Sequence, residues 1–323
     1  MDNNEILNIL TLTKEYVSGQ ALAEQLGVSR QAVWKEIRAL RARGFEIESV
    51  TNRGYRLTAM PAYLNVPAVR AHLTAKIIGC ELEVLDSVGS TNDWLKMRGN
   101  EGCKSGTTVA AREQKSGKGR LGRAWQSKCD ENIAFSVLLR PKMAPSEVAC
   151  ITPLAGLAVC KALRKFTGLD CRIKWPNDVI VGNKKLVGIL TEMSAEFDAV
   201  EYIVTGIGVN VDQEGFPEEI AGKATSLYLE TGRHFDKNAL LACLLNQLEE
   251  EFLASNLELS PTALEEYAKL CATLGKNVGF SRGGSPVHGV AVGVDENGEL
   301  EVMLPDGSIC MVNSGEVTAQ GIY

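Results

Sequence analysis

The chain has 323 residues, more than one typical domain, so we expect two or three units that each bury a core. Hydrophobic residues make up 45% of the chain and charged residues 23%, a balance that excludes a disordered or collagen-like protein. The net charge of −6 excludes a protein that coats nucleic acid with its whole surface, although one basic face can lie within an acidic average.

The first ten residues and the cysteines indicate the compartment. The start, MDNNEILNIL, lacks the Lys and Arg of a signal peptide, and we expect no apolar run as long as a membrane span. The nine cysteines are odd in number and form no CxxC pair, so reduced thiols are expected rather than disulfides or a zinc site. We therefore expect a cytoplasmic protein with no membrane partner.

The first sixty residues combine a helical pattern with two short alternating runs. Apolar residues recur at helical spacing from Glu5 to Leu12, Ser18 precedes a second short helix, and Ser29 can cap a third. The runs 45–47 and 54–57 flank turn residues and indicate a hairpin. We interpret this segment as a helix-turn-helix followed by a β-wing.

This segment is basic although the chain is acidic. Seven Lys or Arg residues stand against three Glu residues between Arg30 and Arg56. Such a face predicts a third helix in the major groove of DNA and wing arginines on the phosphate backbone. The candidate DNA-binding residues are Arg30, Gln31, Trp34, Lys35, Arg38, Arg53 and Arg56. The alternative is a small protein-interaction domain, because helix-turn-helix patterns also occur without DNA.

The middle of the chain reads as a mixed α/β unit. It follows a linker at 59–61 and extends to about Leu270. Apolar stretches lie at 133–139, 179–190 and 202–211, and apolar helices are expected around 152–167 and 238–256. In the last fifty residues, two alternating runs joined by a hairpin turn at 295–298 predict a small β-barrel.

One loop carries the densest chemical signal. The segment GKGRLGR, residues 117–123, interleaves three glycines with three cations and offers backbone N–H groups and positive charge to a phosphate or carboxylate. Trp125 can supply an aromatic face for a purine. The P-loop and dinucleotide-binding patterns both fail here, because Gly119 follows Lys118 and no strand-to-helix turn is indicated. A flexible solvated loop is the alternative.

Two further segments carry candidate chemistry. The run KWPND, residues 174–178, places a cation, a rigid turn and two oxygen-bearing side chains before an apolar strand, as a phosphate and Mg²⁺ site would require. Lys185 at a strand entry can neutralise a carboxylate and the phosphate that it attacks. Alone, these residues could be a turn and a surface lysine. The segments 86–92 and 206–210 are weak signals by themselves.

The ordered set GKGRLGRAW, KWPND, KLVGIL and GIGVN resembles the biotin protein ligase family over roughly residues 80–320. With the winged helix, the chain is similar to the bifunctional bacterial ligases that also repress biotin-synthesis genes. The resemblance implies an α/β (α+β) chain with three domains. These are a winged helix-turn-helix at 1–62, a mixed-sheet catalytic domain for biotin and ATP at 63–270, and an SH3-like β-barrel at 271–323.

The resemblance also implies roles for individual residues. The implied biotin-binding residues are Ser90, Thr91, Asn92, Gln114, Lys118, Gly119, Arg120, Lys185 and Gly188. The implied ATP and adenylate residues are Arg123, Trp125, Lys174, Asn177, Asp178 and Asn210. Catalysis is assigned to Lys185, Arg120 and Lys174, and Mg²⁺ to Asn177 and Asp178. The family loop often reads Gly-Arg-Gly-Arg-Arg-Gly, so Lys118 and Leu121 depart from it.

The implied reaction has two steps. The biotin carboxylate attacks the α-phosphorus of ATP to give biotinyl-AMP, and a lysine of the biotin carboxyl-carrier domain of acetyl-CoA carboxylase then takes the biotin. The family also implies a homodimer, promoted by biotinyl-AMP, that binds operator DNA. Two alternatives stay open: a biotin-sensing repressor without enzymatic activity, and a lipoate or octanoate transferase. The cations at 118, 120, 174 and 185 argue against the first, and the C-terminal domain with the complete motif set argues against the second.

Overall fold

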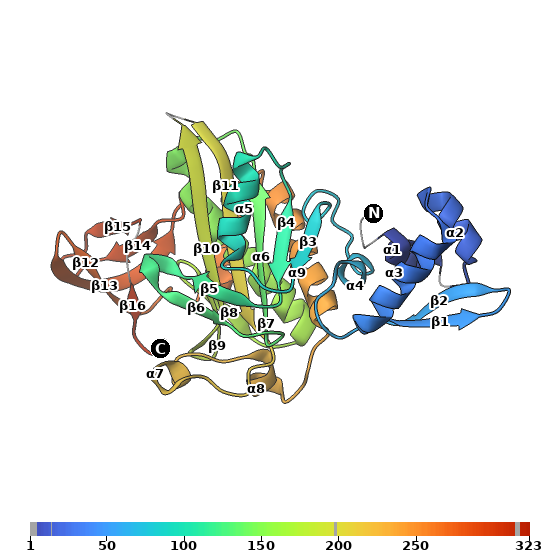
Figure 1. The fold of residues 1–323 in the computed structure, drawn as a ribbon. Coiled ribbons are helices and arrows are strands. Elements are labelled where there is room, and N and C mark those ends of the chain that lie inside the picture. Colours follow the sequence, from blue (N-terminus) through green and yellow to red (C-terminus); the bar gives the residue numbers. More distant parts are fainter. Residues whose placement is uncertain (1–4, 14, 197–198, 314–316) are drawn as a thin grey trace. The chain divides into compact units, whose positions relative to one another are not determined.

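The computed structural model describes residues 5–13, 15–196, 199–313 and 317–323 (Figure 1). The chain divides into two compact units. The first is Met1–Leu73 with Asp236–Ala242, and the second is Thr74–Phe235 with Cys243–Tyr323. The ranges 1–62, 63–270 and 271–323 divide the chain more finely and stay a prediction.

The first unit has the predicted helix-turn-helix and hairpin. Its elements are α1 Glu5–Thr13, α2 Gly19–Leu26, α3 Arg30–Ala42, β1 Glu46–Val50, β2 Gly54–Ala59 and α4 Val66–Arg70. The Ser18 and Ser29 hydroxyls accept hydrogen bonds from backbone N–H groups three residues on, at 3.0 and 3.1 Å, and so cap α2 and α3. Gly27, at φ +63°, ends α2 in the left-handed region that glycine adopts without strain.

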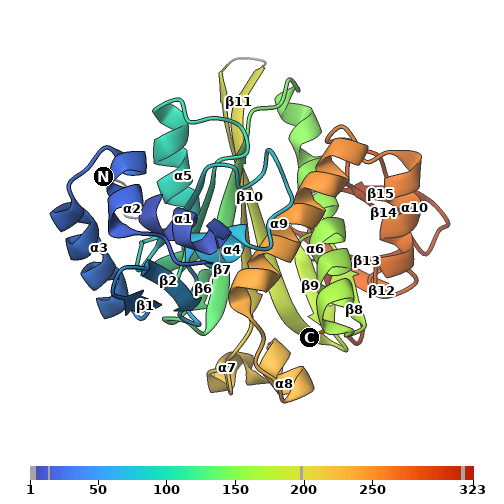
Figure 2. The same cartoon turned by 90° about the vertical axis from the view of Figure 1, so that its right-hand side faces the viewer.

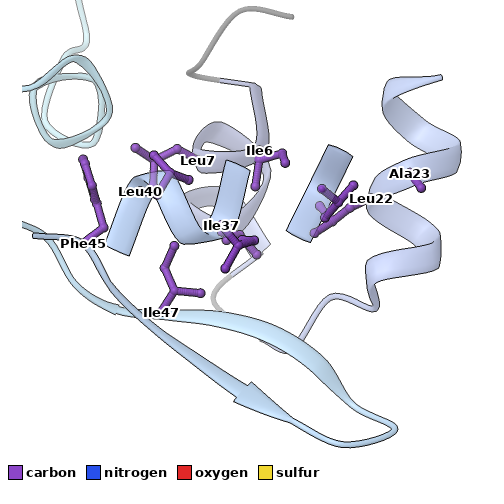
Figure 3. Close-up of a cluster of buried hydrophobic side chains, with 10 residues drawn as sticks. Ile6, Leu7, Leu22, Ala23, Ile37, Leu40, Phe45 and Ile47 are labelled. Carbon is purple, nitrogen blue, oxygen red and sulfur yellow. The ribbon is translucent and has the colours of Figure 1, made fainter. Parts of the chain in front are cut away.

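A buried cluster holds this unit together (Figure 3). Ile37 and Leu40 of α3 lie against Ile6 and Leu7 of α1, and Leu22 of α2 completes the helical side. Each such side chain contributes about 1.5–3 kcal/mol when fully buried. Because these positions fill one face of α3, the predicted DNA-binding residues of that helix are left on its exposed face.

The second unit is built on a seven-stranded sheet of order β3-β4-β7-β11-β10-β9-β8. Its strands are β3 Leu82–Leu85, β4 Thr108–Ala111, β7 Asn132–Leu139, β8 Cys171–Lys174, β9 Asp178–Val181, β10 Lys184–Glu196 and β11 Ala199–Asn210. Only β3 and β4 pair in parallel among these strands as described. The apolar stretch 179–190 is two antiparallel strands, because Gly182, at φ +58°, turns the chain within it.

Helices and shorter elements complete this unit. They are α5 Thr91–Asn100, α6 Ile151–Thr167, α7 Glu218–Ala221, α8 Leu227–Thr231, α10 Pro261–Leu270, the 3-10 turns η1 Arg120–Gly122 and η2 Pro145–Cys150, and the hairpin β5 Gln114–Lys118 with β6 Ala124–Ser127. The helix α9 Lys237–Ala254 belongs to the first unit up to Ala242 and to this unit from Cys243. The helices expected around 152–167 and 238–256 are therefore confirmed within two residues at each end. The leucines of α9 at 240, 241, 244, 245 and 248 are buried, as expected of a core helix.

The two faces of the large sheet differ in what covers them. Strand residues alternate between faces, and Gly188 pairs with Gly208 while Ile189 pairs with Ile207. The Ile189 side chain lies near Gly156 of α6, whereas Asn92 of α5 lies over Gly206. Figure 2 shows α5 and α6 on opposite sides of β10 and β11. The face of the sheet that carries Gly188, Gly206 and Gly208 is therefore the one covered by α5, and we call it the α5 face.

The expectation of no membrane-length apolar run is wrong by length and composition. The helical run Pro145–Thr167 is long and apolar enough to cross a membrane, but 72% of its apolar window is buried inside the fold. Its residues pack against the sheet, which explains their apolar character. All nine cysteines are free thiols.

The C-terminal residues form a five-stranded sheet of order β15-β14-β13-β12-β16. Its strands are β12 Asn277–Arg282, β13 Ser285–Val294, β14 Leu300–Met303, β15 Ile309–Val312 and β16 Thr318–Ala319. The predicted hairpin turn at 295–298 joins β13 to β14. No pairing closes β15 onto β16 in the described part of the chain, so the predicted barrel is instead an open SH3-like sheet. The indole N–H of Trp175 donates to the Gly298 carbonyl at 2.9 Å and ties this sheet to the KWPND turn.

Candidate active site

A small cavity of about 50 Å³ lies on the α5 face of the large sheet. Its lining brings together all nine residues predicted to bind biotin: Ser90, Thr91, Asn92, Gln114, Lys118, Gly119, Arg120, Lys185 and Gly188. Trp125 and Asn177 line it too, whereas Arg123, Lys174, Asp178 and Asn210 do not. Residues more than ninety positions apart in sequence therefore meet at one place.

The first turn of α5 forms a polar end of the cavity. The Thr91 backbone N–H donates to Gln114 Oε1 at 2.8 Å, and Ser136 Oγ donates to Asn92 Oδ1 at 2.6 Å. The Asn92 amide donates to Glu192 Oε2 at 2.7 Å, and Glu192 in turn pairs with Lys96 at 2.7 Å. Because these bonds hold Thr91 and Asn92 in one arrangement, this end is preorganised. The predicted contacts of these side chains with biotin stay predictions.

Glycines form the floor of the cavity because other side chains lie directly on the backbone there. A Cβ atom at Gly208 would stand 2.6 Å from Nε1 of Trp125, and one at Gly188 would stand 2.9 Å from Cζ3 of the same indole. At Gly206 a Cβ would stand 2.9 Å from Cγ of Asn92. Any side chain at these positions would therefore displace the indole or the amide. The sequence motif GIGVN drew attention to this strand, but not to Gly206 and Gly208 as lining residues.

The predicted glycine-rich loop is a two-stranded hairpin with a 3-10 turn at its tip. Strand β5 pairs with β6, and the Gly119 N–H donates to the Arg123 carbonyl at 2.7 Å. Leu121 stands 70% exposed at φ +56°, so its replacement of a family arginine leaves an apolar side chain in solvent. The Lys118 ammonium lies 2.7 Å from Oδ2 of Asp93, a carboxylate of the chain itself. The predicted contact of Lys118 with biotin stays a prediction.

Cations gather at the opposite end of the cavity. The Lys185 ammonium lies 2.6 Å from Asp178 Oδ1 and 5.7 Å from the Trp125 ring centroid. Arg120 donates to Asn177 Oδ1 at 3.2 Å, and burial lowers the pKa of its guanidinium. Burial also lowers the pKa of Lys174 to about 8, a shift that Lys185 and Arg123 reinforce and Asp178 opposes. Several cations thus share one nearby carboxylate, which suits an anionic ligand.

Buried polar atoms without partners lie where β7 begins and β11 ends. Asn132 and Asn210 are opposite one another in the sheet, and the Gln213 amide donates to Asn210 Oδ1 at 3.2 Å. Asn132 Oδ1, Gln213 Oε1 and Trp125 Nε1 are buried without a hydrogen-bond partner among the described residues. A buried polar atom left unpaired costs about 1–3 kcal/mol, so this place suits a ligand with donors and acceptors.

Asn177 and Asp178 do not fit a protein-held Mg²⁺ as they are arranged. The two Asp178 oxygens are engaged by Lys185 and by the Tyr323 hydroxyl, and Asn177 Oδ1 accepts from Arg120. Within the described ranges no three His, Cys, Asp or Glu side chains gather as a metal site. A hard cation prefers several oxygen ligands, whereas the side-chain oxygens of Asn177 and Asp178 are already bonded to groups of the chain.

Several residues near the site were missed by sequence reasoning. Ser136, Glu192 and Lys96 fix Asn92, but nothing in the sequence marks a buried serine in an apolar strand as a partner of residue 92. Trp175 lies within a recognised motif, and its burial and bond to Gly298 give it a structural role.

The predicted DNA-binding residues lie on α3 and the β1–β2 wing. Arg30, Gln31, Trp34, Lys35, Arg38 and Arg53 are exposed, whereas Arg56 is partly buried. The Arg56 guanidinium lies 2.9 Å from Glu48, and the guanidinium carbons of Arg53 and Arg56 lie 4.4 and 4.7 Å from the Tyr16 ring centroid. The wing therefore presents two cations of different availability, with Arg53 the more exposed.

Known protein families match three parts of the chain. An HTH domain matches residues 3–56, the Biotin/lipoate A/B protein ligase family matches residues 84–210, and the Biotin protein ligase C terminal domain matches residues 273–318. These matches coincide with the helix-turn-helix, with much of the seven-stranded sheet, and with the C-terminal sheet.

Individual relatives extend over most of the chain. It is 35% identical over 298 residues to the bifunctional ligase/repressor BirA of Bacillus spizizenii, across 91% of each protein. It is 30% identical over 319 residues to BirA of Escherichia coli, across 98% of each protein. The structure resembles the biotin protein ligase from Aquifex aeolicus in complex with biotin and ATP, with a TM-score of 0.63 and 31% identity, covering 74% of this chain and 98% of that one. The chain therefore belongs to the BirA family of bifunctional biotin ligase/repressors, with an N-terminal HTH DNA-binding domain and a ligase domain.

Proposed function

We propose that the cavity on the α5 face binds biotin, that ATP binds between its cationic end and the end of β11, and that the chain transfers biotin to a carboxylase carrier domain. The observation that carries this proposal is that all nine residues expected to bind biotin line one cavity. The cations at its other end suit the carboxylate and phosphates of the two substrates.

The first step joins two anions, and this explains the cations. The biotin carboxylate attacks the α-phosphorus of ATP, the bond to the β-phosphate oxygen breaks, and pyrophosphate leaves with the electron pair. Lys185 and Arg120 reduce the repulsion between the reacting groups, while Lys174 and Arg123 stabilise the negative charge that moves onto pyrophosphate. Trp125 and Asn210 contact the adenine. The nitrogen and oxygen atoms of the adenylate can then bond to the buried unpaired atoms Trp125 Nε1, Asn132 Oδ1 and Gln213 Oε1.

The second step needs no nucleophile from this chain. The amine of an acceptor lysine attacks the carbonyl of biotinyl-AMP, an amide forms and AMP leaves. The acceptor we propose is the biotin carboxyl-carrier domain of acetyl-CoA carboxylase. Asp178 is engaged by Lys185 and Asn177 by Arg120, so a Mg²⁺ ion in this site would be held by the triphosphate of ATP.

The winged helix gives the chain a second role in regulation. We propose that it binds the operator of biotin-synthesis genes in the cytoplasm and that it does so as a homodimer promoted by biotinyl-AMP. The exposed side chains of α3 would enter the major groove, and Arg53 would contact phosphate.

The ligase proposal is tested by ATP-dependent incorporation of radiolabelled biotin into a carrier domain. The wild type is compared with Lys185→Ala and with Lys184→Ala, which removes a neighbouring ammonium outside the cavity lining. We expect transfer that requires ATP, falls at least about 100-fold in Lys185→Ala and stays near wild type in Lys184→Ala. Labelled lipoate in place of biotin should not be transferred.

The other outcomes separate the alternatives. Tight biotin binding without transfer by the wild type would contradict the enzymatic assignment and leave a sensor repressor. Transfer of lipoate or octanoate at a rate comparable to biotin would contradict the substrate assignment. Equal activity in Lys185→Ala and the wild type would remove Lys185 from the catalytic residues.

A further inference from the structure

Tyr323 lies among the residues that we assign to the triphosphate, although no sequence motif includes it. Its hydroxyl donates to Asp178 Oδ2, and its ring centroid lies 3.7 Å from the Lys174 ammonium. Its backbone N–H donates to the Asn183 carbonyl at 3.2 Å, in the turn between β9 and β10. Both views place the C-terminal end beside β9 (Figures 1 and 2). One side chain thus contacts an anion and a cation of the site together.

The hydrogen bond divides the Asp178 carboxylate between two partners. Oδ2 accepts from Tyr323, and Oδ1 lies 2.6 Å from the Lys185 ammonium. Asp178 is 8% exposed, so water cannot readily replace either partner. Without the phenol, the carboxylate would be free to rotate and to offer both oxygens to Lys185. The ammonium would then be held more tightly by the protein and would be less available to a ligand.

The ring of Tyr323 acts on a second cation. A lysine ammonium within about 6 Å of an aromatic centroid is attracted by the electrons of the ring face. The contact at 3.7 Å therefore holds the flexible Lys174 side chain in one place without neutralising its charge. An acidic partner would hold the ammonium equally well but would compete with phosphate.

A purely structural role for Tyr323 is already filled by its neighbour. Ile322 is buried at 6% exposure, and an isolated bridge joins residue 322 to Ala319 at the end of β16. Apolar anchoring of this segment therefore belongs to Ile322, whereas Tyr323 directs its polar atom at Asp178. This division provides a matched pair of variants.

We propose that Tyr323 is a positioning residue for adenylate formation, which sets the side chains of Asp178, Lys185 and Lys174 for the phosphates of ATP. The proposal rests on the ATP-dependent ligase function proposed above. It predicts that loss of the Tyr323 hydroxyl lowers the use of ATP far more than the affinity for biotin, because Lys185 is only one of the nine residues assigned to biotin. The predicted biotin contacts Thr91 and Asn92, at the start of α5, are held by Gln114, Ser136 and Glu192 and not by Tyr323.

The test is biotin-dependent exchange of labelled pyrophosphate into ATP by the full chain. Tyr323→Phe removes the hydroxyl and keeps the ring, Tyr323→Leu removes both, and Ile322→Ala weakens only the apolar anchor. We expect kcat/KM for ATP to fall about tenfold in Tyr323→Phe and further in Tyr323→Leu. The dissociation constant for biotin, measured by Trp fluorescence, should stay within about twofold of wild type, and Ile322→Ala should show no selective loss for ATP.

Three results would overturn the proposal. They are wild-type kcat/KM for ATP in Tyr323→Phe, a biotin affinity that falls in parallel with ATP use, and an equal and selective loss for ATP in Ile322→Ala. Absence of biotin-dependent exchange in the wild type would instead overturn the ligase function itself, so the two failures are distinguishable. Melting temperatures of all three variants identify any loss that comes from unfolding.

Discussion

The indole of Trp125 lies directly against the backbone of Gly208, where a Cβ atom would stand 2.6 Å from Cζ2 of the ring. The added methyl group of Gly208→Ala would therefore displace the indole from its position over β11. We expect biotin and ATP binding to weaken at least about tenfold, because each loses an aromatic surface worth one or more kcal/mol. Isothermal titration with each ligand measures the effect.

Gly156→Ala is the control for this prediction. Residue 156 lies in α6 on the opposite face of the sheet, and its nearest neighbours stand 3.8 Å or more from an added Cβ. Ligand affinities should not change in this variant, and alanine should suit the helix better than glycine. Unchanged affinities in Gly208→Ala would show that the indole does not contact the ligands.

An ion pair joins the residue two positions before β5 to a residue just after β6, at the base of the hairpin. Arg112 donates to both Asp130 oxygens, at 2.8 and 2.6 Å, and its remaining amino group donates to Asp86 at 2.8 Å. Asp130 adopts φ +61°, a conformation that asparagine also tolerates, so Asp130→Asn removes the charge without new backbone strain. The pair is partly exposed, and we expect a loss of about 1–2 kcal/mol in the free energy of unfolding.

Urea unfolding of Asp130→Asn beside Glu131→Gln checks this value. The second variant removes a neighbouring carboxylate that takes no part in the pair with Arg112. A stability of Asp130→Asn equal to that of Glu131→Gln would contradict a stabilising clamp. Since the hairpin carries Lys118 and Trp125, we also expect a higher KM for biotin in Asp130→Asn.

Local signals were sufficient for much of the fold and of the site. Ser18 and Ser29 mark the starts of two helices because a cap bonds to the N–H three residues on, within reach of sequence reasoning. The cations and glycines of the 117–123 loop likewise indicate anion binding from composition alone. These features depend on residues close together in the chain.

Non-local partners could not be predicted from one sequence. Ser136 meets Asn92 only because β7 and the start of α5 are brought together by the sheet order, and register across a sheet is not written in the local pattern. The ion pair of Asp93 with Lys118 was not predictable for the same reason, since α5 and β5 are brought together by packing. The prediction of a closed barrel was wrong as well. Alternation of apolar and polar residues predicts strands but does not determine whether the last strand pairs with the first.

Lys174 provides a pH dependence. Burial lowers its pKa from 10.5 to about 8, so the folded site loses this positive charge as the pH rises through 8. We expect kcat/KM for ATP to decline above pH 8, and Lys174→Arg to extend activity to higher pH because guanidinium remains protonated. From this group alone, stability should rise between pH 8 and 10.5, since the unfolded chain binds the proton more strongly. An identical alkaline decline in both proteins would exclude Lys174 as its cause.

The wing predicts how DNA affinity depends on salt. Arg53 is exposed and stacks on Tyr16, whereas Arg56 pairs with Glu48, whose pKa is lowered by its bonds to Tyr16 and Arg56. Arg53→Ala should therefore weaken binding to any DNA and reduce the slope of log K against log salt by about one. Arg56→Ala should change that slope less, because its charge is already compensated.

Glu48→Gln supplies the opposite change in the same wing. It removes a negative charge and releases Arg56 from its partner, so affinity at low salt and the salt slope should both increase. Fluorescence anisotropy with a labelled duplex over a range of salt concentrations measures both quantities, and Lys104→Ala, in the other compact unit, is the control for net charge. If Arg53→Ala and Lys104→Ala gave the same slope as wild type while Glu48→Gln had no effect, phosphate would not contact this wing, and binding would have to rest on α3 alone.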